Sequence, residues 1–103
     1  MKIYNKLVRD KIPEIIGATG KRFDVHFAKK EELLPLLETK LNEEVSEYLE
    51  DKNLEELADV MEVLIGLASS LGYSEEDLFN KRNQKKEERG GFKKGIVLEQ
   101  VYE

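Results

Sequence analysis

The sequence predicts a mainly α-helical fold, a helical bundle with one or two short strands at its periphery. Long segments in the middle of the chain carry apolar residues every three or four positions, which is the spacing of one face of a helix. Only short segments near the two ends are rich in β-prone residues. The chain has 103 residues, enough for one domain and too few for two. We therefore expect residues 1–103 to form a single, compact domain.

The composition excludes several classes of protein. The chain has no cysteine, which rules out disulfide scaffolds, thiolate zinc sites and cysteine nucleophiles. Its 40% apolar content is too high for a disordered chain. The N-terminal residues mix charges and lack the apolar core of a signal peptide. The longest apolar run, Val63 to Ala68, is far short of the ~20 residues that cross a bilayer. These features predict a soluble, cytoplasmic protein without a membrane partner.

The elements at the two ends of the chain are expected to be short. A helix begins near Asp10, with Pro13 in its first turn, and ends by Gly20. The segment Arg22–Ala28 alternates between apolar and polar side chains, which predicts a strand. The tail, Ile96–Tyr102, is also β-prone, and we expect it to pair with that strand.

The helices between these ends are expected to be longer. The first, from about Glu31 to Glu50, has apolar side chains at helical spacing. The second runs from about Leu54 to Leu71 and follows Asn53, an N-cap residue. The last begins after Ser74 and continues to about Arg89.

Charge is distributed unevenly along the chain. The segment from Glu31 to Glu62 contains twelve acidic and two basic residues, a net charge of −10, whereas the rest of the chain carries +5. Basic side chains are densest between Lys81 and Lys94. Charge runs are usually solvated helix faces. The positions of the charges on each helix therefore decide whether they form a site.

Acidic side chains lie at matching heights of the predicted helical hairpin. Glu44 and Glu47 are one turn apart on its first helix, and Glu56 and Asp59 are one turn apart on its second. In an antiparallel hairpin that turns near Lys52, Glu47 faces Glu56 and Glu44 faces Asp59. At ~100° per residue, Glu44 and Glu56 also fall within the apolar arcs of their helices. The hairpin thus brings carboxylates together at an apolar interface.

These carboxylates are candidate metal ligands. Carboxylates in an apolar interface are costly unless cations neutralise them, and only Lys40 is nearby in sequence. Oxygen ligands without His or Cys favour Mg²⁺, with Mn²⁺ as the second candidate, over zinc. The alternative is that Glu56 merely completes a capping box with Asn53 and that the others are surface charges. The matching heights and inward angles favour the metal site. Other acidic residues of the hairpin are expected on solvated faces: Glu43, Glu50, Glu55 and Glu62.

Basic residues outside the hairpin are candidate phosphate ligands. Mg²⁺ held by carboxylates commonly also binds phosphate oxygens. Lys81, Lys85 and Arg89 are spaced by four on one predicted helix face, and Lys6 and Arg9 lie near the N-terminus. Each is individually as consistent with an ordinary surface charge. As a set opposite in sign to the acidic hairpin, they favour a triphosphate ligand.

Motifs in the hairpin and at the two ends resemble a known enzyme superfamily. The Glu-x-x-Glu pair at 44–47 and the Glu-x-x-Asp pair at 56–59 resemble the signature of the all-α nucleoside triphosphate pyrophosphohydrolases, which include MazG and phosphoribosyl-ATP pyrophosphohydrolase. The stretches Tyr4–Pro13 and Glu88–Phe92 resemble a small MazG-like branch described as phosphoribosyl-ATP pyrophosphohydrolase-like. The eight-residue spacer between the two acidic pairs is shorter than is usual in MazG proteins.

The resemblance implies a Mg²⁺-dependent enzyme that cleaves nucleoside triphosphates between the α- and β-phosphates. The products would be a nucleoside monophosphate and pyrophosphate, in house-cleaning of (d)NTPs. Glu44, Glu47, Glu56 and Asp59 would hold the metal, and Glu44 or Glu47 would take the proton of the attacking water. The resemblance also implies that a homo-oligomer, a dimer or a tetramer, completes the bundle. The wide apolar arc of the second hairpin helix agrees with that.

Two alternative functions remain. The first is phosphoribosyl-ATP hydrolysis, although the all-α enzymes for that reaction typically have a Tyr-His pair where this chain has Val60 and Met61. The second is a catalytically silent helical adaptor, against which the intact acidic positions argue. A nucleic-acid partner is not expected, because the basic patch has few aromatic residues and the acidic centre repels phosphate without a metal.

Overall fold

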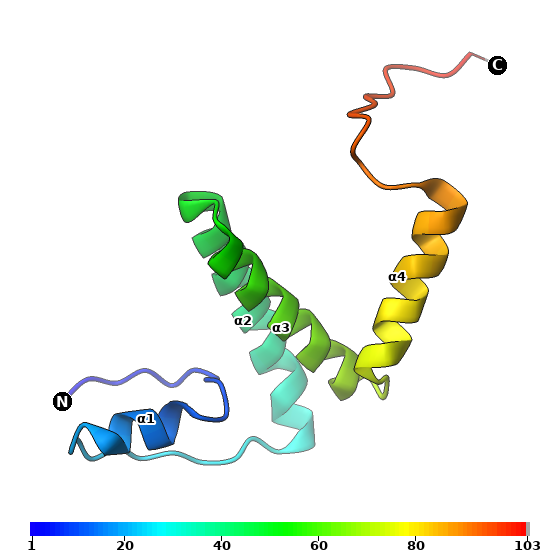
Figure 1. The fold of residues 1–103 in the computed structure, drawn as a ribbon. Helices are drawn as coiled ribbons and strands as arrows, with labels where there is room; N and C mark the ends of the chain where they lie inside the picture. Colours follow the sequence, from blue (N-terminus) through cyan, green and yellow to red (C-terminus); the bar gives the residue numbers. More distant parts are fainter. Residues whose placement is uncertain (103) are drawn as a thin grey trace.

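The chain is mainly α-helical, as the sequence predicts. The computed structural model describes residues 1–102, and within them the regular elements are four helices: α1 (Ile12–Ala18), α2 (Lys30–Asp51), α3 (Leu54–Ser70) and α4 (Glu75–Arg89) (Figure 1). The three longer helices begin and end within about one residue of the predicted positions. No single helix in this part of the chain is both long and apolar enough to cross a bilayer by itself.

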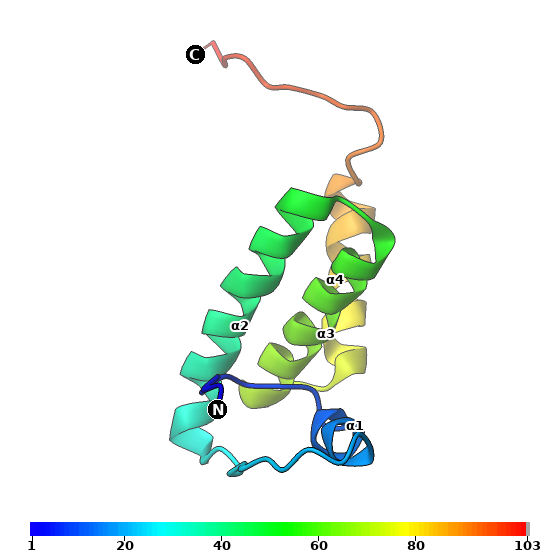
Figure 2. The same cartoon turned by 90° about the vertical axis from the view of Figure 1, so that its left-hand side faces the viewer.

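An antiparallel hairpin of α2 and α3 is the centre of the molecule (Figure 2). The turn between them consists of Lys52 and Asn53. Lys52 adopts the left-handed conformation (φ 48°, ψ 52°) and its N–H donates to the carbonyl of Tyr48. The Asn53 side chain accepts from the N–H of Glu56 at 2.9 Å and so caps α3 as predicted. This short turn fixes the register of the hairpin.

The core of the hairpin is small. Its buried apolar side chains are Leu37, Val63 and Ala68. Leu37 packs onto Gly66, because a Cβ placed there would be 3.1 Å from Leu37 Cδ2. The absence of a side chain at Gly66 therefore lets the two helices approach closely. Glu44 is as well buried as these apolar residues, with 7% of its surface exposed.

The last helix departs from the hairpin. α4 bends away from α3 by 110° and, among the four helices, packs only against α3 (Figure 1). Both bonds of a capping box between Ser74 and Asp77 start it, as the sequence predicts. Beyond Gly90 the tail runs away from the helices with its large apolar side chains exposed.

The single chain is not the compact domain that its length predicts. Its radius of gyration is 18.1 Å, against about 13 Å for a compact domain of 100 residues. Its accessible surface is 9741 Å², whereas a folded monomer of this size exposes about 5,900 Å². The segment before α2, together with α4 and the tail, is almost entirely exposed and contributes to this difference.

The two predicted strands are wrong, since neither segment forms a strand within residues 1–102. Arg22–Ala28 is an irregular connection from α1 to α2. Its Phe23 turns back toward α1, where Cε1 lies 3.4 Å from the position of a Gly17 Cβ, and its His26 pairs with Glu32 at 3.1 Å. The tail, Ile96–Tyr102, lies at the opposite end of the molecule (Figure 1). A strand needs a neighbour for its backbone N–H and C=O groups, and the fold separates these two segments.

Candidate metal centre

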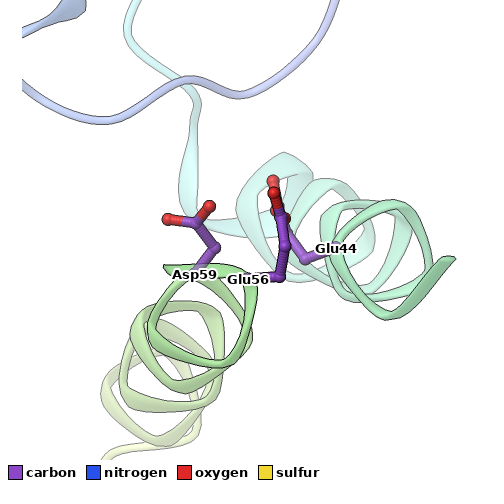
Figure 3. A group of neighbouring side chains, drawn as sticks. All are labelled: Glu44, Glu56 and Asp59. Carbon is purple, nitrogen blue, oxygen red and sulfur yellow. The ribbon is translucent and has the colours of Figure 1, made fainter. Parts of the chain in front are cut away.

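Carboxylates of α2 and α3 converge on one side of the hairpin. Glu44, Glu56 and Asp59 each offer an oxygen atom, and these oxygens all lie within 4.8 Å of one another (Figure 3). We call these residues the acidic cluster. Glu56 and Asp59 are one turn apart on the face of α3 beside α2, and the antiparallel register sets Glu44 opposite them. The structure therefore brings together three of the four predicted ligands.

Burial makes the acidic cluster unusual. Glu44 Oε2 and Glu56 Oε2 are inaccessible to solvent and have no hydrogen-bond partner among the described residues. A buried carboxylate oxygen without a donor or a cation is costly. Lys40 Nζ lies 3.3 Å from the other oxygen, Glu44 Oε1, and offsets part of the charge. The two oxygens without a donor are available to a further cation.

Mutual repulsion is visible in the pKa values around the cluster. Burial, followed by the negative charge of Asp59, raises the pKa of Glu56 above its ordinary value. The neighbouring carboxylate of Glu44 raises the pKa of Glu47 above its ordinary value. Without a metal, the charged carboxylate is therefore less favourable at both positions than in an ordinary glutamate. A hard divalent cation would remove this penalty, and an all-oxygen donor set fits Mg²⁺ or Mn²⁺.

Glu47 lies beside the acidic cluster and not within it. Its side chain is exposed, in contrast to that of Glu44 one turn earlier. Glu56 is also not the capping partner considered as an alternative. In the described part of the chain, Glu56 does not accept the bond from the Asn53 N–H that would complete a capping box. Its carboxylate belongs to the cluster instead.

Two basic residues of the N-terminal segment contact carboxylates at or next to the acidic cluster. Arg9 Nη2 donates to Asp59 Oδ1 at 2.6 Å, and Lys6 Nζ donates to Glu43 Oε1 at 3.0 Å. The N-terminal segment thus crosses the same side of the hairpin that carries the cluster (Figures 2 and 3).

The prediction that Glu43 only faces solvent is wrong. Glu43 binds both Lys6 and Lys40, the latter at 3.2 Å. The hydrogen bond from Lys6 is the main cause that lowers the pKa of Glu43. Lys40 precedes Glu43 by three residues, so helical spacing predicts the contact between them. The contact with Lys6 joins distant segments and has no local sequence signal.

The predicted phosphate ligands of α4 do not meet the acidic cluster within one chain. Among the described residues, no ion pair connects Lys81, Lys85 or Arg89 with a carboxylate of α2 or α3. Lys81 Nζ donates instead to Gln84 of its own helix at 3.0 Å. These residues lie on α4, which the 110° bend carries away from the hairpin.

An apolar groove occupies the angle between α3 and α4. It has a volume of about 850 Å³. Four leucines line it: Leu64, Leu67, Leu71 and Leu78. The polar residues Lys81 and Gln84 of α4 also line it. The groove contains none of the acidic cluster and is a separate feature of the surface.

Comparisons with known proteins do not supply a family for this chain. No family model matches it, and the searches of curated proteins and of solved structures gave no significant match. Its function is therefore inferred from the geometry of the acidic cluster and from the motifs in the sequence.

Proposed function

We propose that this protein is a Mg²⁺-dependent nucleoside triphosphate pyrophosphohydrolase of the all-α, MazG-like superfamily. It cleaves the α–β phosphate bond of (d)NTPs and releases a nucleoside monophosphate and pyrophosphate. The observation that carries the proposal is the convergence of Glu44, Glu56 and Asp59 around buried carboxylate oxygens without donors. Burying carboxylate oxygens without a donor or a cation costs free energy, so this arrangement is not expected of ordinary surface carboxylates.

The acidic cluster is the metal site in this proposal. Glu44, Glu56 and Asp59 hold Mg²⁺, with Mn²⁺ as a substitute. The bound cation supplies Lewis-acid polarisation of phosphate oxygens and lowers the pKa of a bound water. Lys40, which contacts Glu43 at 3.2 Å and Glu44 at 3.3 Å, holds the α2 side of the site in place.

Glu47 is the better suited of the two predicted general bases. Its exposed carboxylate can accept a proton from water, whereas the Glu44 side chain is buried and belongs to the cluster. Glu44 also raises the pKa of Glu47, which makes Glu47 a stronger base than an ordinary glutamate. Glu47 thus acts from the edge of the site while the others bind.

Phosphate binding is assigned first to the N-terminal segment. Arg9 already contacts Asp59 of the acidic cluster, and Lys6 contacts the neighbouring Glu43, so a polyphosphate bound there meets their positive charges. Lys81, Lys85 and Arg89 of α4 stay predicted phosphate ligands. They reach the site only if α4 moves or a second copy of the chain presents them.

A homo-oligomer, a dimer or a tetramer, is part of the proposal. The surface exposed beyond that of a folded monomer is roughly 3,800 Å² per chain, and obligate interfaces bury about 2,000–5,000 Å² over both partners, or about 1,000–2,500 Å² per chain. The apolar groove between α3 and α4 is the face that we expect a second copy to cover. Sedimentation velocity of the full chain should therefore show a dimer or larger species, and Leu67→Glu should shift it toward monomer.

A substrate panel tests the activity. The full chain is incubated with standard and modified nucleoside triphosphates, with Mg²⁺ or with a chelator, and pyrophosphate and monophosphate are measured. We expect equimolar pyrophosphate and monophosphate from at least one triphosphate, and only with the metal. Diphosphate and inorganic phosphate would contradict cleavage at the α–β bond.

The two alternative functions give other results. Hydrolysis of phosphoribosyl-ATP with no (d)NTP activity would identify the histidine-pathway reaction. An adaptor would hydrolyse no compound, and Mg²⁺ would leave its melting temperature unchanged. A rise in melting temperature with Mg²⁺ is what binding to the folded acidic cluster requires.

A further inference from the structure

We propose that Arg9 is an exchangeable counter-ion of the metal site. It neutralises Asp59 in the metal-free protein and transfers to a phosphate of the ligand when a divalent cation occupies the acidic cluster. This inference rests on the proposed metal site and adds an order of events to it. Arg9 is then both a competitor of the metal and a ligand of the substrate.

The charges around the cluster support the exchange. Its three carboxylates are faced by Lys40 at 3.3 Å from Glu44 and by Arg9 at 2.6 Å from Asp59. A divalent cation together with Lys40 would balance the three negative charges. The Arg9 guanidinium would then lie next to a metal of the same sign, which weakens its attraction to Asp59.

The two cations differ in how firmly they are held. Lys40 is on α2 itself and only 16% of its side chain is exposed. The Arg9 side chain is 53% exposed. Arg9 belongs to the N-terminal segment and is separated from Asp59 by 50 positions in the sequence. Exposed ion pairs contribute little to stability. The weaker pair is therefore the one that a metal can replace.

The backbone allows the Arg9 side chain to move locally. The Arg9 carbonyl accepts from the Ile12 N–H at 3.0 Å, which anchors its backbone to the start of α1. Lys6 holds the segment independently through Glu43. The guanidinium can thus leave Asp59 while the segment stays over the site, where a phosphate would be bound.

Calorimetry with two probes tests the exchange. The full chain is titrated with Mn²⁺ alone, and then with pyrophosphate in saturating Mg²⁺. In Arg9→Gln we expect Mn²⁺ to bind about two- to fivefold more tightly than in the wild type, since a competing exposed ion pair is lost. We expect pyrophosphate to bind more weakly. A merely structural role would weaken both.

The matched control is Arg22→Gln, which removes the charge of an exposed arginine with no ion pair among the described residues. It should leave both affinities unchanged. Circular dichroism establishes that each variant is folded. An NMR signal of the Arg9 guanidinium, assigned by its absence in Arg9→Gln, should be lost or shifted when Mg²⁺ is added.

The outcomes separate this inference from the proposed function. Unchanged or weaker Mn²⁺ binding by Arg9→Gln overturns the exchange, even if the wild type hydrolyses triphosphates. If the wild type binds Mn²⁺ but releases no pyrophosphate from any triphosphate, the activity fails while tighter binding by Arg9→Gln still supports the exchange. No Mn²⁺ binding by the wild type overturns both.

Discussion

The hairpin of α2 and α3 has a buried interior within a single chain. The arm, formed by α4 and the described part of the tail, does not. In the hairpin, Glu44 is buried and pairs with Lys40 of the same helix, and Asp59 pairs with Arg9 of the N-terminal segment. In the arm, apolar residues such as Phe92 and Ile96 are 99% and 81% exposed. The acidic cluster is therefore formed within one chain, whereas the predicted phosphate ligands of α4 are not brought to it. The pairing of α2 with α3 is sufficient to assemble the acidic cluster. The basic residues of α4 would need contacts beyond those of the single chain to reach it.

The largest expected effect is loss of activity in hairpin variants. Asp59→Asn, Glu56→Gln and Glu47→Gln should each reduce pyrophosphate release by about 100- to 1,000-fold, because each removes a charge that binds the metal or the water proton. The control on the arm is Glu87→Gln, an exposed acidic residue of α4. Undiminished activity in the hairpin variants would show that the acidic cluster is not the active site.

A stability comparison between the core and the arm should give the next largest effect. Leu37→Ala removes a buried side chain that packs on Gly66 and should lower the free energy of unfolding by about 2–3 kcal/mol. Leu78→Ala, at a half-buried position beside the groove, should cost about 1 kcal/mol in dilute protein. Urea denaturation at several protein concentrations measures both free-energy changes. If a second copy covers the groove, the cost of Leu78→Ala rises with concentration, whereas a constant cost would leave the groove uncovered.

A smaller effect should appear in the pH dependence of stability without metal. The folded state raises the pKa of Glu56 and Glu47, so these groups favour folding at acidic pH, and this contribution is lost as pH rises through their raised values. Glu56→Gln should therefore raise the melting temperature at pH 7 in a chelator and abolish further stabilisation by Mg²⁺. Thermal melts from pH 4 to 8 measure this. A lower melting temperature at pH 7 would contradict unrelieved repulsion in the cluster.

The smallest effect is expected for the pair that fastens the N-terminal segment. Lys6→Ala should destabilise the protein by less than about 1 kcal/mol, because the contact with Glu43 is partly exposed. Glu43 has a lowered pKa, so its contribution is present above its ordinary pKa and is lost as pH falls through the lowered value. The loss caused by Lys6→Ala should therefore vanish in acid. A loss that persists at low pH would indicate apolar packing by the lysine stem.

Local signals predicted much of the fold. The caps at Asn53 and Ser74 and the apolar spacing located α2, α3 and α4. Those signals act within a few residues and do not depend on the rest of the chain. The strands were mispredicted because alternation at Arg22–Ala28 indicates only a tendency, and a strand also needs a partner that the fold does not bring near.

The sequence also predicted part of the acidic cluster. Equal heights in a hairpin placed Glu44, Glu56 and Asp59 together, because a short turn leaves little freedom of register. The height rule could not decide how far Glu47 projects from the interface. The direction of α4 was also beyond sequence reasoning, because the residues between α3 and α4 predict a break in the helix but not its 110° angle.

The two-residue turn of Lys52 and Asn53 has a consequence for how this protein can vary in length. One residue inserted there would rotate α3 by about 100° relative to α2 and turn Glu56 and Asp59 away from Glu44. The connection between α1 and α2, by contrast, is irregular and can change in length without moving these carboxylates. Insertions, tags or fused domains are therefore better placed at the tail than in the hairpin turn, where a change in length would also change the acidic cluster.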